Sequence, residues 1–164
     1  MNKLKVEFTY KWEPVLADEN REYFFPEEIT SFMKRNYRHP VIYRWNIFRK
    51  EPEDEKIIYI GEAQELCPQR INGYLNPGPS QRTNKRIREE FQSYLEKGFK
   101  IKLEILRFVE IKISDFIITY NDLSDKHVRR FIEELMIVTH KQKGFKLLNL
   151  WRYVIAIGNN YVWF

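Results

Sequence analysis

Alternating apolar and polar positions predict two neighbouring strands in the first half of the chain. Residues 41–48 combine β-branched and aromatic residues with interleaved polar ones, which is typical of a strand, and residues 57–60 form a shorter run of the same kind. The segment between them is polar and contains a proline, so we expect a loop that joins the strands into a hairpin. Such a hairpin brings Tyr43 and Tyr59 to one surface. Gly61 follows the second strand, where a small residue permits a sharp exit into a helix.

The rest of the pattern predicts further strands and helices in alternation. Strands are expected from period-2 alternation, and helices from apolar residues at 3–4 spacing together with capping residues and terminating glycines. In chain order we expect a strand over 3–12, a short helix from Pro26 through Met33, a helix after Gly61, a helix over 85–96 capped by Thr83 or Asn84, a strand over 100–109, an extra strand or hairpin within 110–121, a long helix from Ser124 or Asp125 to Gly144, and an aromatic tail over 151–164 that packs back on the sheet.

Six residues on these elements stand in an order that points to one family. They are Tyr43 in Val41-Ile42-Tyr43, Tyr59 in Tyr59-Ile60-Gly61, Arg70 and Tyr74 four apart on one helix face, Glu133 in Ile132-Glu133-Glu134-Leu135, and Asn149 after Leu147-Leu148. Over about residues 40–149 the chain resembles the GIY-YIG nuclease family. It departs from the family pattern at Val41, where the first tripeptide opens with glycine, and at Glu62, where a basic residue is frequent.

The resemblance implies a role for each of these residues in phosphodiester hydrolysis. Glu133 would hold a Mg²⁺ ion, with Mn²⁺ as a substitute, and its neighbour Glu134 is the alternative ligand. Arg70 would grip a non-bridging phosphate oxygen with its planar guanidinium. Tyr43 is the expected general base and Tyr59 the alternative, while Tyr74 and Asn149 would position the other groups. Taken singly, each residue has an ordinary structural reading as strand packing, helix surface or turn.

The resemblance and the hydrophobic pattern together predict an α/β (α+β) fold. We expect a small, mainly antiparallel three-stranded sheet flanked by helices, with an N-terminal strand–helix extension and an aromatic C-terminal tail. At 164 residues the chain is long enough for one domain with its own core, so we expect a single domain over 1–164. The nuclease core is expected over about 38–150, the extension over 1–37 and the tail over 151–164.

Positive charge is concentrated in two segments of the chain. The net charge is +5, but residues 76–102 carry seven Lys and Arg against three Glu, and residues 127–164 carry six against two. Such blocks attract phosphate groups, although ordinary solvated helix faces explain them equally well. Aromatic residues make up 16% of the chain and supply core material and stacking surfaces. Cys67 is the only cysteine, which excludes an internal disulfide and a cysteine-based zinc site.

A turn-rich loop and the helix after it are the expected nucleic-acid-binding segment. This stretch gathers amides that can read bases and cations that can bind phosphates: Gln81, Arg82, Asn84, Lys85, Arg86 and Arg88. A capped surface helix with incidental charge is the alternative. Arg86 also competes with Arg70 for the role of the catalytic arginine, and His140 is an outside candidate for a site role.

The function we expect is metal-dependent cleavage of DNA, either double-stranded or branched, by a restriction-like or repair and recombination nuclease. One alternative is a DNA-binding module that keeps the fold but has lost turnover, and another is an RNA-directed nuclease, because basic charge does not distinguish the sugars. A homodimer is possible if the recognition site is palindromic. The chain has no apolar run of membrane-spanning length and no apolar stretch at its N-terminus, so we expect a cytoplasmic protein without a membrane partner.

Overall fold

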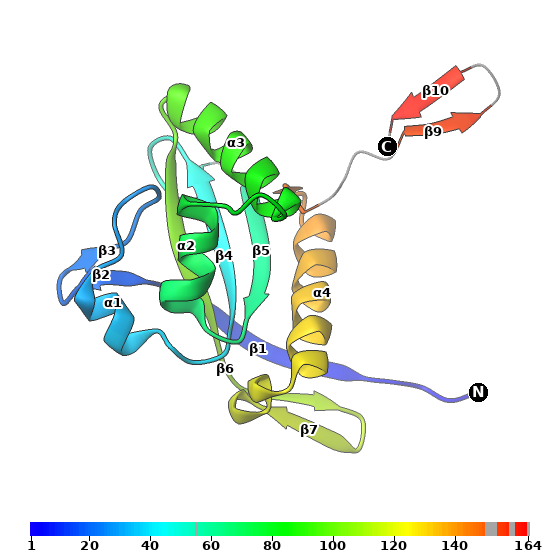
Figure 1. Ribbon diagram of the computed structural model, residues 1–164. Helices are drawn as coiled ribbons and strands as arrows, with labels where there is room; N and C mark the ends of the chain where they lie inside the picture. Colours follow the sequence, from blue (N-terminus) through cyan, green and yellow to red (C-terminus); the bar gives the residue numbers. More distant parts are fainter. Residues whose placement is uncertain (55, 150–153, 158–159, 164) are drawn as a thin grey trace.

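A six-stranded sheet forms the centre of the protein. The computed structural model describes residues 1–54 and 56–149, and the backbone of residues 154–157 and 160–163. The sheet has the order β1-β6-β4-β5-β8, and β7 also pairs with β6 (Figure 1). Its strands are β1 (Val6–Pro14), β4 (Val41–Phe48), β5 (Ile57–Ala63), β6 (Lys100–Ile113), β7 (Phe116–Thr119) and β8 (Lys146–Leu147). All pairs are antiparallel except β5 with β8.

Helices cover both faces of this sheet. The α-helices are α1 (Ser31–Asn36), α2 (Ile71–Leu75), α3 (Arg82–Glu96) and α4 (Lys126–Gln142). A kinked helical segment η1 (Leu66–Arg70), in which Cys67 has an extended backbone, precedes α2, and a 3-10 helix η2 (Tyr120–Ser124) precedes α4. Two short strands, β2 (Leu16–Asp18) and β3 (Arg21–Glu22), pair with each other. In Figure 1, α2 and α3 lie across one face of the sheet, while α4 runs alongside β5.

The alternation along β4 explains why the sheet is buried on both sides. Tyr43 and Trp45 belong to the core that packs under α1, α2 and α3, whereas Ile42 belongs to a second core under α4. Removing a large apolar side chain from water contributes about 1.5–3 kcal/mol, so each face of β4 anchors its own layer of helices. Both clusters reach β5, where Tyr59 faces the first core and Ile60 the second.

The expected mixed α/β fold is confirmed, but the expected three-stranded sheet is wrong. The long strand β6 has 14 residues and continues four residues beyond the predicted end at Val109. Its first half pairs with β4, and β1 pairs along it from Glu104 to Ile113. β1 therefore joins the sheet instead of standing apart as an extension, because a strand that long leaves a row of backbone groups to be paired.

Several predicted elements are confirmed at their ends. The strand over 41–48 is β4, the hairpin expected within 110–121 is β6–β7, and the long helix is α4. Asp125 caps α4 by accepting a hydrogen bond from the His127 N–H, and Gly144 follows the helix with φ of +83°. These ends were predictable because each depends on a residue type with a local role.

Other predicted ends are wrong, and one lies partly outside the described residues. The first helix begins at Ser31 rather than Pro26, because Thr30 caps it by accepting from the Met33 N–H. Helix α3 begins at Arg82, so neither Thr83 nor Asn84 is its cap. In the tail, β9 (Val154–Ile157) and β10 (Asn160–Trp163) pair with each other. The packing of the tail's side chains lies outside the described residues. None of the described helices has the length and apolar character needed to cross a bilayer.

Candidate active site

The pairing of β4 with β5 brings the two tyrosine tripeptides together. Tyr43 lies directly opposite Gly61 in the antiparallel register. A Cβ atom at position 61 would lie 2.3 Å from the Tyr43 Oη and 2.4 Å from its Cζ. Gly61 is therefore required because the Tyr43 side chain lies against the backbone of β5. The glycine of the second tripeptide makes room for the tyrosine of the first.

A third phenol completes the cluster from the helix that follows. Tyr74 in α2 is hydrogen-bonded to Tyr43, with 2.5 Å between the two hydroxyl oxygens. Its ring centroid lies 6.3 Å from that of Tyr43 and 6.0 Å from that of Tyr59, both in edge-on arrangements. Arg70 lies one turn before Tyr74, as expected from the four-residue spacing. The structure thus brings together the three predicted tyrosines and the predicted arginine.

Burial raises the pKa of all three phenols. For Tyr43 and Tyr59, burial is the largest cause, and the carboxylate of Glu133 raises the pKa further. The positive charge of Arg70 and the interaction with Tyr74 lower it again in both cases, without offsetting burial. The pKa of Tyr74 is raised by burial and by the two neighbouring phenols. At neutral pH the cluster is therefore a set of protonated hydroxyls, and Tyr59, at 8% exposure, is less buried than Tyr43 and Tyr74 at 1% each.

Glu133 on α4 faces this cluster and is half-buried. Its pKa is raised to about 7, mainly by burial and then by the negative charges of Glu62 and Glu134, while Arg70 and Arg130 lower it. Glu134 is exposed. The two carboxylates are adjacent on the helix and point about 100° apart, so only one of them can face the phenols. Glu133 is the one that does.

A buried ion pair that the sequence did not reveal attaches α4 to β5. Arg129 is 4% exposed, and its Nε donates to Glu62 Oε2 at 2.5 Å. Its Nη1 donates to Gln64 Oε1 at 2.7 Å and also to backbone carbonyls just before α4. Arg129 precedes Glu133 by one helical turn, so this pair fixes where Glu133 stands. The sequence signal was Glu62 itself, an acidic residue in a strand, and its basic partner is on α4.

Asn149 and Arg86 hold the backbone around the site. The Asn149 amide accepts from the Ile60 N–H at 2.8 Å and donates to the Ile60 carbonyl at 2.6 Å, so it fixes the strand between Tyr59 and Gly61. Arg86 donates to the Leu148 carbonyl at 2.9 Å, and its positive charge lowers the pKa of Tyr59. Arg86 therefore lies at the edge of the site, apart from the exposed residues of the same helix.

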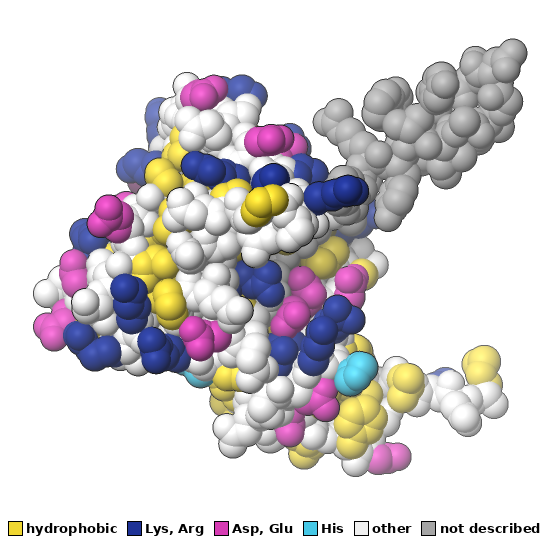
Figure 2. All heavy atoms as spheres, in the orientation of Figure 1, with side chains coloured by type: hydrophobic (Ala, Val, Ile, Leu, Met, Phe, Trp, Pro, Cys, Tyr) yellow, Lys and Arg dark blue, Asp and Glu magenta, His cyan; other side chains and the backbone are white. Residues whose placement is uncertain are grey.

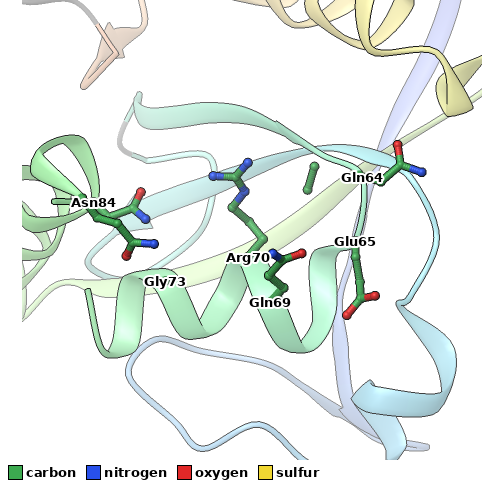
Figure 3. Close-up of a pocket in the computed structure, with 8 residues that line it drawn as sticks. Gln64, Glu65, Gln69, Arg70, Gly73 and Asn84 are labelled. Atoms are coloured by element: carbon green, nitrogen blue, oxygen red, sulfur yellow. The ribbon is translucent and has the colours of Figure 1, made fainter. Parts of the chain in front are cut away.

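The remaining predicted nucleic-acid contacts divide into two groups. Arg82, Lys85 and Arg88 are exposed on α3, where Figure 2 shows basic side chains gathered over the helix. Gln81 and Asn84 instead line a pocket together with Arg70 (Figure 3). In Figure 2, acidic and basic side chains meet in the hollow between α2 and α4.

His140 does not join the site. Its Nδ1 is hydrogen-bonded to the Met136 carbonyl at 2.7 Å, and its Nε2 accepts from the indole of Trp12 at 3.3 Å. Within the described part of the chain, no group of three or more His, Cys, Asp or Glu side chains is placed to hold a metal ion. The acidic side chains at the phenol cluster are Glu133 and the ion-paired Glu62.

Comparison of the chain with protein-family models, with curated proteins and with solved structures found no match.

Proposed function

We propose that this protein is a metal-dependent endonuclease that hydrolyses phosphodiester bonds of DNA, with a site of the GIY-YIG kind. The observation that carries the proposal is the convergence of three phenols, Arg70 and a half-buried carboxylate. They come from β4, β5, the η1–α2 segment and α4, which are up to 90 residues apart in the chain. Structural packing alone does not require an ionisable group with a shifted pKa beside three phenols, whereas such groups gather at catalytic sites.

Glu133 is the residue that fits a bound metal ion. A half-buried carboxylate with a pKa near 7 is destabilised in its charged form, and a bound cation relieves that destabilisation. Mg²⁺ keeps most of its waters and takes one or two carboxylates together with phosphate oxygens, so a single protein ligand is sufficient. When bound, Mg²⁺ or Mn²⁺ would neutralise the charge that develops on the phosphate. Glu62 is engaged by Arg129 and serves to hold α4 in place.

Arg70 is the group that would bind the phosphate to be cleaved. Its positive charge interacts both with the phenols and with the carboxylate of Glu133. Its guanidinium can donate two parallel hydrogen bonds to phosphate oxygens. Tyr59, the most exposed of the three phenols and one whose pKa the charge of Arg70 lowers, is the phenol that a phosphate bound at Arg70 would meet first.

Tyr43 is the proposed general base, and its surroundings indicate how it could act. A phenol accepts a proton effectively only as phenolate, and burial opposes that form. Arg70 and the hydrogen bond from Tyr74 favour the phenolate, whereas the negative charge of Glu133 disfavours it. Neutralising Glu133 therefore acts in the same direction as Arg70 and Tyr74, by removing one of the charges that raise the pKa of Tyr43, although burial is the largest cause. Tyr43 would take a proton from the attacking water while the water oxygen bonds to phosphorus. The existing P–O bond would then break, and the released oxygen would take up a proton from solvent water.

The exposed cations of α3 would guide the DNA to this site. Arg82, Lys85 and Arg88 lie on the same helix as Arg86, which reaches the site edge. Contacts with phosphates supply affinity without sequence information. The strand path would therefore run from α3 across Arg70.

Incubation of the purified protein with supercoiled plasmid, branched DNA and single-stranded RNA, in Mg²⁺, Mn²⁺ or EDTA, tests the proposal. We expect nicking or linearisation of DNA in either metal and none in EDTA. DNA binding without cleavage in any metal would favour a recognition module that has lost turnover. Cleavage confined to RNA would favour an RNA-directed nuclease instead.

A further inference from the structure

A pocket beside Arg70 is lined mainly by carboxamide side chains (Figure 3). Gln64 follows β5, Gln69 precedes Arg70 in the chain, and Gln81 and Asn84 belong to the start of α3. Three separate segments therefore bring four amides around one guanidinium. Among the described residues, Glu65 is the other charged side chain of the lining, so the lining carries no net charge.

Two of these amides have a fixed orientation. The Oε1 atom of Gln64 accepts a hydrogen bond from Arg129, and the Oε1 atom of Gln81 accepts from the Gly78 N–H at 3.0 Å. Both partners can only donate, so the assignment of oxygen and nitrogen in each amide is determined. The oxygens are engaged, and the NH₂ groups of Gln64 and Gln81 are the parts that can meet a ligand as donors.

The other two amides keep both a donor and an acceptor. The side chains of Gln69 and Asn84 make no hydrogen bond within the part of the chain that the structure describes. Asn84 lies close against α2, where a Cβ atom on Gly73 would be 2.9 Å from its Nδ2. In Figure 3 the Asn84 amide points from α3 toward the side of the pocket on which Arg70 lies. Gly73 thus leaves the space that the amide occupies.

The chemistry of this lining fits a nucleobase better than a phosphate. A phosphate is an anion, and the chain offers it the exposed cations of α3, whereas four neutral amides add no charge to the pocket. A carboxamide with a free donor and a free acceptor matches the N7 acceptor and the N6 amino group of adenine. The donors of Gln64 and Gln81 add partners for further base acceptors.

We propose that this pocket reads the base of a nucleotide next to the scissile phosphate, and that Asn84 makes it prefer adenine. The inference rests on the proposed nuclease function, because Arg70 joins the pocket to the phenol cluster. The bound nucleotide would have its phosphate at Arg70 and its base between the amides of α3 and those that flank η1. Neighbouring residues of α3 would then have different roles. Asn84 would contact the base and determine specificity, while Arg82 and Arg88 would bind phosphates of the DNA backbone.

Selection of bound sequences from a random-sequence DNA library in EDTA tests the pocket without requiring cleavage. We expect the wild-type protein to enrich adenine at one fixed position by about tenfold or more, as a bidentate amide contact provides. Asn84→Asp has nearly the same shape but no donor, so it should lose the adenine and gain cytosine at that position, because a carboxylate accepts from the cytosine amino group. Gln69→Leu should weaken the same preference. Gln92→Ala, which removes an exposed amide of α3 outside this pocket, should leave it unchanged.

The outcomes separate this inference from the nuclease proposal. DNA bound without any base preference, or an adenine preference that survives in both Asn84→Asp and Gln69→Leu, would overturn the reading of the pocket. Cleavage of the library in Mg²⁺ under those same outcomes would leave the nuclease proposal standing. Selection of adenine by a wild-type protein that does not cleave DNA would support the proposed base-binding pocket and contradict the proposed nuclease activity. Melting temperatures within a few degrees of the wild type are the control for folding.

Discussion

Two clusters beside β4 and β5 bury charge in opposite ways. On the face toward α4, Arg44 donates to Glu104 at 2.6 Å and lies 4.6 Å from the centroid of the Trp12 ring, and Lys102 approaches the same carboxylate at 3.5 Å. On the face toward α2, Tyr43 belongs to the phenol cluster. Glu133 acts on this cluster from α4, which runs alongside β5, and makes no ion pair among the described residues. The first group is compensated within the fold, whereas the second leaves a carboxylate with a raised pKa.

The cluster around Glu104 stabilises the fold, whereas the carboxylate of Glu133 is free to bind a proton or a cation. A buried charge is costly unless it is paired, so the fold compensates the carboxylate of Glu104 but leaves that of Glu133 destabilised in its charged form. Such a group gains stability from a cation or a proton that comes from outside the chain. The variants below alter either the paired cluster around Glu104 or the site that contains Glu133 and the phenols.

Removing the uncompensated carboxylate should have the largest effect on activity. Glu133→Gln preserves shape but removes the charge that would hold the metal, so DNA cleavage should fall by about a thousandfold or more while DNA binding persists. The melting temperature should not fall, because the variant no longer buries a carboxylate. Single-turnover cleavage and thermal melting measure both. Glu134→Gln is the matched control, and loss of cleavage in that variant with activity kept in Glu133→Gln would transfer the role.

Disrupting the ion-paired cluster around Glu104 should lower the stability of the fold and leave the cleavage activity unchanged. Glu104→Leu leaves Arg44 and Lys102 without their shared partner, which costs about 3–5 kcal/mol for a buried pair. The rate of cleavage per folded molecule should stay at the wild-type value. Chemical denaturation and active-site-normalised rates check this. Glu13→Gln is the comparison variant, because Glu13 and Arg107 form an ion pair that is much more exposed than the pair of Arg44 with Glu104. It should lower the free energy of unfolding by at most about 1 kcal/mol. A Glu104→Leu protein as stable as Glu13→Gln would contradict the structural reading of this cluster.

Deleting one hydroxyl of the phenol cluster should lower the rate and leave the fold. Tyr43→Phe keeps the buried ring and removes the oxygen bonded to Tyr74, so cleavage should slow roughly a hundredfold if the phenol is the base. Tyr37→Phe is the control, because that hydroxyl accepts from the Leu16 N–H and not from a member of the phenol cluster, so its loss should affect only stability. Cleavage by Tyr43→Phe at the wild-type rate would show that Tyr43 is not the general base and would make Tyr59 the next candidate.

The smallest expected effect is the dependence of stability on pH. The pKa of Glu133 is raised in the folded protein, so between its ordinary value near 4.5 and about 7 the folded state binds a proton that the unfolded state has released. The contribution of Glu133 to stability is therefore greatest below that range and is lost as the pH rises through it. Unfolding free energies across pH 4–8 should show this loss in the wild type and lack it in Glu133→Gln. Identical profiles for the two proteins would contradict the shifted pKa.

Local patterns predicted the elements of the fold, and long-range pairing limited the rest. The alternation over 41–48 and the cap at Asp125 act over a few residues, so β4 and the start of α4 could be located from the sequence. The size of the sheet could not, because the pairing of β1 with β6 joins residues about a hundred positions apart. The order of the tripeptides was sufficient to place Tyr43 and Tyr59 together, but not to show that Gly61 makes room for the Tyr43 ring.

The same limit applies to the candidate site. The positions of Arg70 and Tyr74 followed from helical spacing, whereas the pair of Arg129 with Glu62 spans 67 residues and carries no local pattern. From the sequence, the basic residues within 76–102 could be interpreted only as a single nucleic-acid-binding segment. Only the fold separates the exposed Arg82 from Asn84 in the pocket and from Arg86, which is bound to the Leu148 carbonyl.

Titration of Glu133 itself tests the central claim most directly. Nuclear magnetic resonance of protein labelled with ¹³C at the glutamate carboxyls, with the signal assigned by its absence in Glu133→Gln, gives the pKa of this one group. We predict a pKa of about 7 without divalent metal and a clear decrease when Mg²⁺ is added, because the cation stabilises the carboxylate. A pKa near the ordinary 4.5, or one that Mg²⁺ leaves unchanged, would contradict the account.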